Sequence, residues 1–375
     1  MTSGSWRGAT RVVHAGRSDP VQGAPLLPGP VFAGSYRHAG DPMGEPFTYG
    51  RYSNPTWSAY EAALSELEGG DALVFASGMA AVAAVLSATL RPGDVVVLPS
   101  DGYYTVRLLA EGYLTEMGVK VRLAVSGDLQ RQALDAARLL WLESPTNPGL
   151  DVCDLRALAA AARDNGTLVA VDNTTATPLA QQPLALGADI SVCSDSKAMT
   201  GHDDLLLGHV ATRDRELLAR LLAYRTQGGA IPGPMETWLA HRSLATLDVR
   251  VRRQSANALT IAEALWRHPA VLGCRFPGLP DDPAHHQASR QMSLYGPIVS
   301  FTLADQRAAE RWLAALRLVT PATSFGGVHS TAERRARWGG DNVHPGFIRL
   351  SLGIEDPEDL VHDVNQALNE LAPAT

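Results

Sequence analysis

The stretch 168–208 reads LVAVDNTTATPLAQQPLALGADISVCSDSKAMTGHDDLLLG and decides the fold that we predict for this chain. Its two short apolar runs, residues 168–171 and 190–193, are typical of buried strands in a parallel sheet. Each run ends abruptly in polar residues, DNT after the first and SDSK after the second. Because ligands of open α/β sheets bind just beyond the carboxyl ends of the strands, we expect an acid and a lysine at one rim of the sheet.

The acid is Asp172 and the lysine is Lys197, and this pair matches the demands of pyridoxal phosphate. That cofactor needs an amine with which to form an imine and an acid opposite its ring nitrogen. A desolvated lysine near other groups has the lowered pKa that a Schiff-base lysine requires. Ser194 and Ser196 flank the lysine and would hold part of the phosphate. On these residues alone a plainer interpretation stays open, in which Asp172 caps a helix and Lys197 is a solvated loop lysine.

The composition is that of an ordinary soluble globular protein, with 45% hydrophobic and 19% charged residues among 375. A net charge of −7 argues against nucleic-acid and acidic-membrane partners, and the basic run ERRARW at 333–338 is too short to change that. The first residues lack the apolar segment of a signal peptide, and no window is continuous enough to span a membrane. Cys153, Cys193 and Cys274 lack paired or metal-ligand spacing, so we expect a cytoplasmic protein without disulfides or a metal site.

Three regions are expected along the chain. Residues 1–55 are rich in glycine and proline and lack periodicity, which predicts an extended arm lying on a partner subunit. Residues 56–245 alternate between strand and helix patterns and predict a doubly wound α/β domain. Residues 246–375 predict a smaller C-terminal domain. Within the arm, Tyr49 and Arg51 would point to the same side, which suits phosphate recognition but also plain surface packing.

The turn after the strand predicted at 72–75 is a candidate anion site. Ser77, Gly78 and Met79 follow this strand and precede a helix predicted at 80–90. A helix N-terminus offers free backbone N–H groups to an anion. The segment matches neither a Rossmann glycine fingerprint nor a P-loop, so the prediction concerns phosphate binding in general.

The carboxyl ends of two further predicted strands supply other candidates. The strand at 94–98 leads to Tyr103 and Tyr104, either of which could stack on a flat heterocycle. The strand at 139–143 leads to Asn147, whose amide would face the same crevice. In the C-terminal region, Ser324 lies in a tight turn. Arg349 alternates with apolar residues in the strand at 347–352, so it would point inward to a substrate carboxylate or, equally, to a structural ion pair.

Seven segments support a resemblance that covers nearly the whole chain: YGRYSNPT (49–56), FASGMAA (75–81), ESPTNP (143–148), VDNTTATP (171–178), SDSKAMTGH (194–202), SFGGV (324–328) and IRLSLGIEDPEDL (348–360). Together and in this order they resemble the pyridoxal-phosphate enzymes of cysteine and methionine metabolism. That group contains cystathionine γ-synthase, cystathionine β-lyase, cystathionine γ-lyase and methionine γ-lyase. The resemblance implies a fold-type I transferase with a doubly wound, mostly parallel sheet, a smaller α/β C-terminal domain and an extended N-terminal arm.

The resemblance also implies roles for residues around the cofactor. Lys197 would carry pyridoxal phosphate as an imine, Asp172 would pair with the ring nitrogen, and Tyr103 would stack on the ring. The phosphate would be held by Ser77, Gly78, Met79, Ser194 and Ser196. Tyr49 and Arg51 would reach the phosphate of a neighbouring subunit's cofactor.

The substrate side follows from the same resemblance. Asn147 would lie near the ring oxygen of the cofactor. Ser324 and Arg349 would bind the α-carboxylate of an amino-acid substrate, and Tyr49 would contact the substrate from the partner subunit. The family forms tetramers built as pairs of dimers, so we expect a homo-oligomer with active sites shared across a dimer.

The chain departs from the family pattern near the lysine and at the distal end of the substrate site. The aromatic loop reads GYYT, one residue shorter than the usual Tyr-Gly-Gly-Thr type, so the choice of Tyr103 over Tyr104 is a preference. Ala198 stands where an aromatic residue often follows the lysine, and Asp203 replaces a serine. His329 stands where lyases and synthases often carry a glutamate. These changes bear on the substrate more than on the class of chemistry.

The implied reaction begins when the freed amine of Lys197 removes the Cα proton of the substrate, with Asp172 keeping the ring protonated. A γ-lyase then releases a 2-oxo acid and ammonia, a γ-synthase uses a thiol, and a β-lyase stops after the first deprotonation. The motifs most resemble the γ-lyase branch, so we expect γ-elimination of the cystathionine γ-lyase type. The alternatives are γ-replacement, a specialised lyase of secondary metabolism with an unusual γ-substituted substrate, and a non-catalytic α/β ligand-binding protein.

Overall fold

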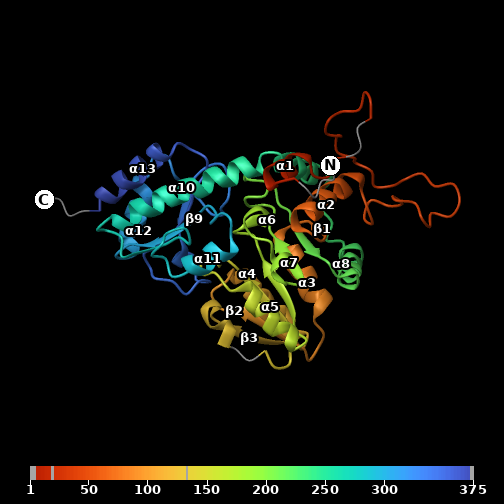
Figure 1. Ribbon diagram of the computed structural model, residues 1–375, viewed down its shortest axis with the longest axis horizontal. Helices are drawn as coiled ribbons and strands as arrows, with labels where there is room; N and C mark the ends of the chain where they lie inside the picture. The colour runs from red at the N-terminus through yellow and green to blue at the C-terminus, as the bar shows by residue number, and fades with distance from the viewer. Residues whose placement is uncertain (1–5, 18–20, 132–133, 372–375) are drawn as a thin grey trace.

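The computed structural model describes residues 6–17, 21–131 and 134–371, which form two sheets flanked by helices (Figure 1). Within these residues the larger sheet has seven strands in the order β1-β7-β6-β5-β4-β2-β3. Neighbouring strands run parallel except at β7, which is antiparallel to both β1 and β6. The strands are β1 (Asp71–Phe75), β2 (Val95–Pro99), β3 (Lys120–Ala124), β4 (Ala137–Glu143), β5 (Leu168–Asp172), β6 (Ile190–Cys193) and β7 (Gly208–Thr212).

Helices cover both faces of this sheet, as a doubly wound fold requires. The main ones are α2 (Pro55–Glu68), α3 (Gly78–Thr89), α4 (Tyr104–Leu109), α5 (Leu155–Asp164), α8 (Arg215–Gly228) and α9 (Pro234–Leu244), with the short α6 (Thr177–Ala180) and α7 (Pro183–Leu186). Side chains alternate along each strand, so Trp141 of β4 packs with α3 and α8 while Leu140 packs with α5 on the other face. The α/β prediction is therefore confirmed for this part of the chain.

The smaller sheet follows the order β10-β11-β12-β9-β8 and is antiparallel apart from the β10–β11 pair. Its strands are β8 (Gly273–Arg275), β9 (Ile298–Thr302), β10 (Thr320–Pro321), β11 (Thr331–Arg334) and β12 (Phe347–Ser351), and its helices are α10 (Leu247–Arg267), α11 (His285–Gln291), α12 (Gln306–Ala315) and α13 (Pro357–Asn369). Phe301 and Trp312 meet edge to face in the core between this sheet and its helices.

Three local expectations need correction. The helical pattern at 235–266 predicts one long helix, but the chain breaks it into α9 and α10 around Ala245 and Thr246. The alternation of strands and helices does not predict β7, which returns antiparallel between β1 and β6 and is buried on both faces. The arm is not extended throughout, because Gly8–His14 forms the short helix α1 near α2 and α10.

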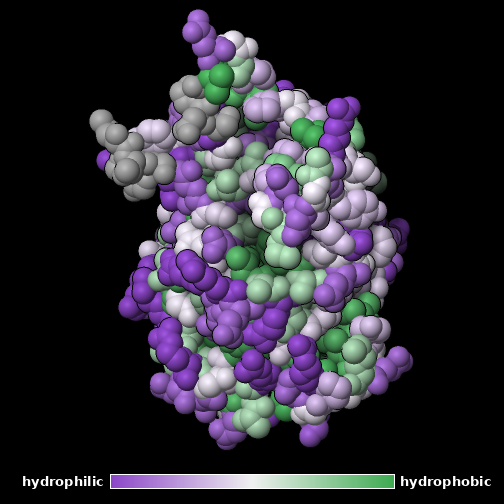
Figure 2. Space-filling view, turned by 90° about the vertical axis from the view of Figure 1, so that its right-hand side faces the viewer, coloured by the Kyte–Doolittle hydropathy of each residue, from purple (hydrophilic) through white to green (hydrophobic). Residues whose placement is uncertain are grey.

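The rest of the described arm, from Val21 to Asn54, projects beyond α2 as a long loop (Figure 1). Large apolar side chains lie exposed along it, including Leu26 at 88% and Met43 at 87% of full exposure. On the side from which the arm projects, hydrophobic residues also gather in a hollow near the middle of the face (Figure 2). No described helix combines the length and the apolar character that crossing a membrane needs.

Candidate active site

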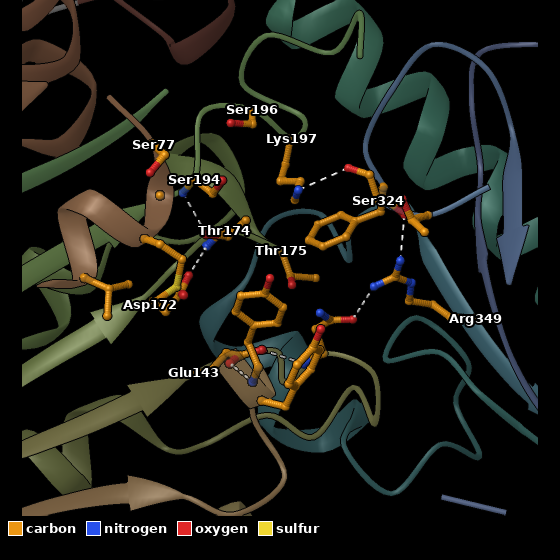
Figure 3. Close-up of a pocket in the computed structure, with 18 of the residues that line it drawn as sticks. Ser77, Glu143, Asp172, Thr174, Thr175, Ser194, Ser196, Lys197, Ser324 and Arg349 are labelled. Carbon is orange, nitrogen blue, oxygen red and sulfur yellow. Dashed lines mark hydrogen bonds between the residues drawn. The ribbon is translucent and has the colours of Figure 1, made fainter. Parts of the chain in front are cut away.

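A pocket of about 390 Å³ opens where the carboxyl ends of β4, β5 and β6 meet the N-terminus of α3 and the smaller sheet (Figure 3). This volume falls within the range of small-molecule sites. The lining includes every predicted site residue except the two from the arm: Ser77, Gly78, Met79, Tyr103, Asn147, Asp172, Ser194, Ser196, Lys197, Ser324 and Arg349. The structure therefore brings these residues together in one pocket, and the roles given to them stay predictions.

Lys197 lies in the turn after β6 and points across the pocket toward the smaller sheet (Figure 3). Its Nζ atom donates a hydrogen bond to Ser324 Oγ at 3.1 Å and lies 5.5 Å from the centre of the Phe325 ring. Burial, followed by the nearby charge of Arg349, lowers the pKa of Lys197. A partly buried amine of lowered pKa is a better nucleophile than a solvated one, so the plainer interpretation of Lys197 as a solvated loop lysine is wrong.

Asp172 is the last residue of β5 and approaches the pocket from the side opposite Ser324 (Figure 3). Its Oδ1 atom accepts a hydrogen bond from the backbone N–H of Thr174 at 3.0 Å. Burial raises the pKa of Asp172, while the hydrogen bonds from Thr174 and the charge of Lys197 oppose that rise. Asp172 does not cap a helix, because α6 begins only at Thr177 and its first turn has no side-chain cap.

The N-terminus of α3 forms the anion-binding corner of the pocket. Ser77 is the N-cap residue, and its Oγ accepts from Ala80 N at 3.1 Å. The first-turn N–H groups of Gly78 and Met79 have no acceptor within the helix, as at any helix start. A Cβ atom on Gly78 would lie 2.6 Å from the Cβ of Ser194, so only glycine allows this close approach.

The two serines beside Lys197 differ in whether their hydroxyl groups are already hydrogen-bonded within the protein. The backbone N–H of Ser194 donates to Thr174 Oγ1 at 2.8 Å. Ser194 itself lines the pocket. The Ser196 hydroxyl instead donates to Leu207 O at 3.1 Å and accepts from Leu207 N at 3.0 Å. Its single O–H donor is therefore already engaged within the protein.

Arg349 reaches the pocket from β12 and lies 3% exposed, as its alternation with apolar residues predicts. Its Nη1 donates to Asn147 Oδ1 at 2.8 Å, and its Nη2 donates to the Ser324 carbonyl at 2.7 Å and to the carboxylate of Glu333. Burial lowers the pKa of Arg349 to about 10. Of the two roles that the sequence left open, the structure shows the ion pair, with Glu333, while binding of a substrate carboxylate by Arg349 stays a prediction.

Glu143 is a site residue that sequence reasoning missed. It ends β4 directly beside Asp172 of β5, since the two are Cα partners in the parallel ladder. Its two carboxylate oxygens accept from the backbone N–H groups of Tyr103 at 2.6 Å and Asn147 at 2.7 Å. Burial, together with the charge of Asp172, raises the pKa of Glu143 well above its ordinary value. The signal was present, because this apolar strand also ends in an acid at the rim.

The pocket is also lined by residues to which the sequence analysis gave no role. Tyr103 and Tyr104 both line the pocket, with ring centres 5.4 Å apart. Phe325, Thr174 and Thr175 contribute from the loops on either side, and Glu333, Arg335 and Trp338 contribute from the basic run ERRARW. From the sequence, that run was judged only as too short a basic cluster to attract nucleic acid or an acidic membrane.

Tyr49 and Arg51 lie outside the pocket of their own chain. Arg51 Nη1 donates to the carbonyl of Thr226 at 2.6 Å, and its guanidinium lies 5.4 Å from the Tyr49 ring centre and 5.0 Å from that of Tyr52. The two arm residues are near each other, but the single chain does not bring them to Lys197.

The departures from the family pattern cluster beside the Lys197 turn. Ala198 is buried against Gly326, where a Cβ would lie 2.5 Å from Ala198 N. Asp203 adopts a left-handed backbone with φ of 57° and places its carboxylate against Gly327. Burial raises the pKa of Asp203, and the charge of His329 acts against that rise. The two unusual residues therefore interact.

A buried polar network lies beneath the same turn. His209 Nδ1 bonds to Asp195 Oδ1 at 2.6 Å, His209 Nε2 bonds to Glu68 Oε1 at 2.9 Å, and Tyr60 Oη donates to Asp195 Oδ2 at 3.0 Å. Burial alone would lower the pKa of His209, but Asp195 and Glu68 outweigh it and raise that pKa to about 10. Cys193 lies close enough to Asp195 and His209 for a metal-type cluster, yet both nitrogens of His209 are engaged by carboxylates.

Comparison with known proteins agrees with this geometry. Residues 9–369 match the model of the family described as Cys/Met metabolism PLP-dependent enzyme. The chain is 58% identical to a putative cystathionine gamma-lyase of Streptomyces coelicolor, covering 96% of this chain and 93% of that one. It is 42% identical to a cystathionine gamma-synthase of Mycobacterium tuberculosis, covering 96% of each. It also superposes on apo CalE6, a methionine gamma lyase from Micromonospora echinospora, with a TM-score of 0.91, 41% identity and coverage of 97% and 99%.

The pocket fits the cofactor of these proteins on its own evidence. It combines the amine of Lys197, buried acids that include Asp172, a helix N-terminus with a glycine in close packing, and aromatic rings. The expectation of fold type I and of pyridoxal phosphate as cofactor is confirmed, and the alternative of a non-catalytic ligand-binding protein is wrong. The chain belongs to the pyridoxal-phosphate-dependent enzymes of cysteine and methionine metabolism.

Proposed function

We propose that this enzyme carries out γ-elimination on a γ-substituted L-amino acid such as cystathionine, giving a 2-oxo acid and ammonia. The observation that carries the proposal is the meeting of Lys197, Asp172 and Arg349 in one pocket with the N-terminus of α3. These groups correspond to the amine, the ring-nitrogen partner, the carboxylate ligand and the phosphate cradle that such a reaction needs.

The residues divide the binding of the cofactor among them. Lys197 would carry it covalently, Asp172 would hold its ring nitrogen protonated, Tyr103 would stack on its ring, and Asn147 would lie by its ring oxygen. The phosphate would be held by Ser77, Gly78, Met79, Ser194 and Ser196. The hydroxyl of Ser196 would have to exchange its bond to Leu207 O for one to the phosphate, whereas the first-turn N–H groups of α3 have no acceptor within the helix.

The chain's own groups then handle the protons. When bound, the cofactor supplies an electron sink for the electrons released at Cα. The amine of Lys197, freed by the substrate, takes the Cα proton, for which its lowered pKa is suited. Lys197 and Tyr103 move the further protons that departure of the γ-substituent requires. Ser324 and Arg349 hold the α-carboxylate.

Two alternatives share this machinery. γ-Replacement by a thiol is supported by the likeness to a cystathionine gamma-synthase. A specialised lyase acting on an unusual γ-substituted amino acid is supported by the Asp203–His329 pair, because both residues depart from the pattern that the sequence otherwise resembles.

Product identification from cystathionine separates these reactions. γ-Elimination gives cysteine and 2-oxobutanoate, whereas β-elimination gives homocysteine and pyruvate. We expect the first pair. The second pair would overturn the proposal, and a protein that binds the cofactor but leaves cystathionine intact would favour the specialised lyase. Release of the γ-substituent only in the presence of a thiol would favour γ-replacement.

We also propose that the chain forms a homo-oligomer, a dimer of dimers, in which Tyr49 and Arg51 reach the cofactor phosphate of the neighbouring subunit and Tyr49 contacts its substrate. The projecting arm with its exposed apolar side chains supports this, because such side chains need a covering surface. We expect Arg51→Ala to weaken cofactor retention, measured by dialysis, and Arg37→Ala on the same arm to leave it unchanged. Equal retention in both variants would contradict this role of the arm.

We propose a division into an arm (1–55), a cofactor domain (56–245) and a small domain (246–375), which the two separate sheets support.

We propose a cytoplasmic location as well, since Cys153, Cys193 and Cys274 are all buried and unpaired. Limited proteolysis near residue 55 tests the first proposal, and cell fractionation tests the second.

A further inference from the structure

The basic run ERRARW folds into the wall of the pocket around one carboxylate. Glu333 lies on β11 directly opposite Arg349 on β12, as Cα partners in the antiparallel ladder. Side chains of such partners stand on the same face of the sheet, so the pairing follows from the register. The Glu333 side chain is only 1% exposed, so its charge is offset by protein groups and not by water.

Four donors converge on Glu333. Oε1 accepts from Arg349 and, at 2.7 Å, from Arg335. Oε2 accepts from Trp338 Nε1 at 2.9 Å and from Arg337 at 3.3 Å. Burial would raise the pKa of Glu333, but Arg349, Trp338 and Arg335 together lower it. The carboxylate therefore stays charged.

These contacts determine what Arg349 has left for a ligand. A guanidinium carries five N–H groups, and the bonds to Asn147, the Ser324 carbonyl and Glu333 account for three of them among the described residues. The other two, one on Nε and one on Nη1, are those with which Arg349 would donate to a substrate carboxylate.

The same segment and the glycines after it lie against α4 beside the pocket. Trp338 lines the pocket and is 47% exposed, with the Arg337 guanidinium 4.8 Å from the centre of its ring. Gly340 packs against the ring of Tyr104, and its carbonyl accepts from Arg107 Nη2 at 2.6 Å. A carboxylate that fixes one end of this segment therefore also influences the position of the other end.

We propose that Glu333 is a positioning residue: its carboxylate orients the guanidinium of Arg349 for the α-carboxylate of the substrate and joins that site to the segment Arg335–Trp338. The inference rests on the proposed function, because it assumes that Arg349 receives the carboxylate. It assigns Glu333 no contact with the reacting atoms.

Equilibrium binding of two small amines tests the inference. Glycine carries a charged α-carboxylate, whereas glycinamide carries a neutral amide in its place. Each is titrated into holoenzyme while the visible absorption of the cofactor is followed. In Glu333→Gln we expect the Kd of glycine to rise about tenfold, since one charge-assisted hydrogen bond is lost, and the Kd of glycinamide to stay unchanged. Arg337→Gln is the matched control, since it removes an exposed partner of Glu333 without touching Arg349, and should change either Kd by less than about twofold.

Each remaining outcome is decisive. Unchanged or tighter glycine binding in Glu333→Gln would overturn the inference, because removing a negative charge without loss of orientation should favour a carboxylate. Equal weakening of both ligands would overturn it as well, since a general structural defect does not distinguish them. If Glu333→Gln does not fold, Glu333→Asp carries the same test, with the same selective loss expected. A wild-type protein that gains no visible band with pyridoxal phosphate would instead refute the proposed function itself.

Discussion

The rim of the larger sheet and the wall formed by the smaller sheet meet at one pocket, yet they hold their polar groups differently. At the rim, Asp172 is fixed by the backbone of Thr174, two residues away, and Ser77 by the first turn of its own helix. On the opposite wall, Arg349 is fixed by a strand partner, Glu333, and by Asn147, which lies 202 residues away in the chain. Contacts between near neighbours in the chain thus hold these rim groups, and contacts between separate strands and loops hold Arg349.

This difference suggests a division of roles. Groups held by adjacent backbone keep their positions when a neighbouring side chain changes, which suits a cofactor that is common to the whole family. Groups held through an ion-pair network move when any member changes, which suits the side that selects the substrate. The departures at Asp203 and His329 also meet on this side of the pocket, beside the Gly326–Gly327 turn between β10 and β11.

The largest effect is expected from Asp172→Asn at the rim. An amide cannot hold the cofactor ring protonated, so we expect kcat to fall about a thousandfold or more while the fold is kept. The measurement is steady-state turnover, with circular dichroism as the control for folding. Turnover within tenfold of the wild type would remove Asp172 from its proposed role.

On the opposite wall, Arg349→Lys keeps the charge but loses the planar fork. Lysine has three N–H groups, too few for Asn147, Ser324, Glu333 and a substrate carboxylate, so we expect kcat/KM to fall roughly a hundredfold, mainly through KM. Kinetics on cystathionine measure this, and the cofactor absorption should not change. A loss confined to kcat would instead place Arg349 in the chemical step.

A smaller effect is expected from Gly78→Ala, which tests how closely the rim is packed. The new methyl group would lie 2.6 Å from the Cβ of Ser194, so the corner that holds the phosphate must shift. We expect cofactor affinity to fall about tenfold, from titration of the apoenzyme. Gly127→Ala is the control, since nothing lies within 4 Å of a Cβ added there.

The smallest effect concerns pH and the network under the Lys197 turn. The pKa of His209 is about 10 in the folded protein and near 6.5 in an unfolded chain. A pKa raised by folding contributes stability that is complete below about pH 6.5 and is lost as the pH rises to about 10. The difference in unfolding free energy between wild type and His209→Asn, from urea titrations, should therefore shrink over this range. A difference that grows with pH would contradict the charged state assigned to His209.

The sequence predicted the rim of the larger sheet better than the wall formed by the smaller sheet. The carboxyl ends of β5 and β6 could be predicted because each strand is an apolar run followed directly by polar residues. The same pattern therefore identified Asp172 and Lys197 as candidates. Glu143 carried the same signal but was not used. Glu333 could not be found this way, because its partner depends on the register of β11 against β12, and β11 itself was not predicted. The antiparallel β7 was missed because a buried strand does not reveal its direction.

The central claim is a covalent bond between one amine and the cofactor, and the chain is well suited to testing it, because Lys120 and Lys197 are its two lysines. Lys120 lies exposed at the start of the edge strand β3. Holoenzyme is reduced with borohydride, digested and mapped by mass spectrometry, with Lys120→Arg as the control. We predict the pyridoxyl label on Lys197 in both proteins. Label on Lys120 alone, or a cofactor that washes away unlabelled after reduction, would contradict the account.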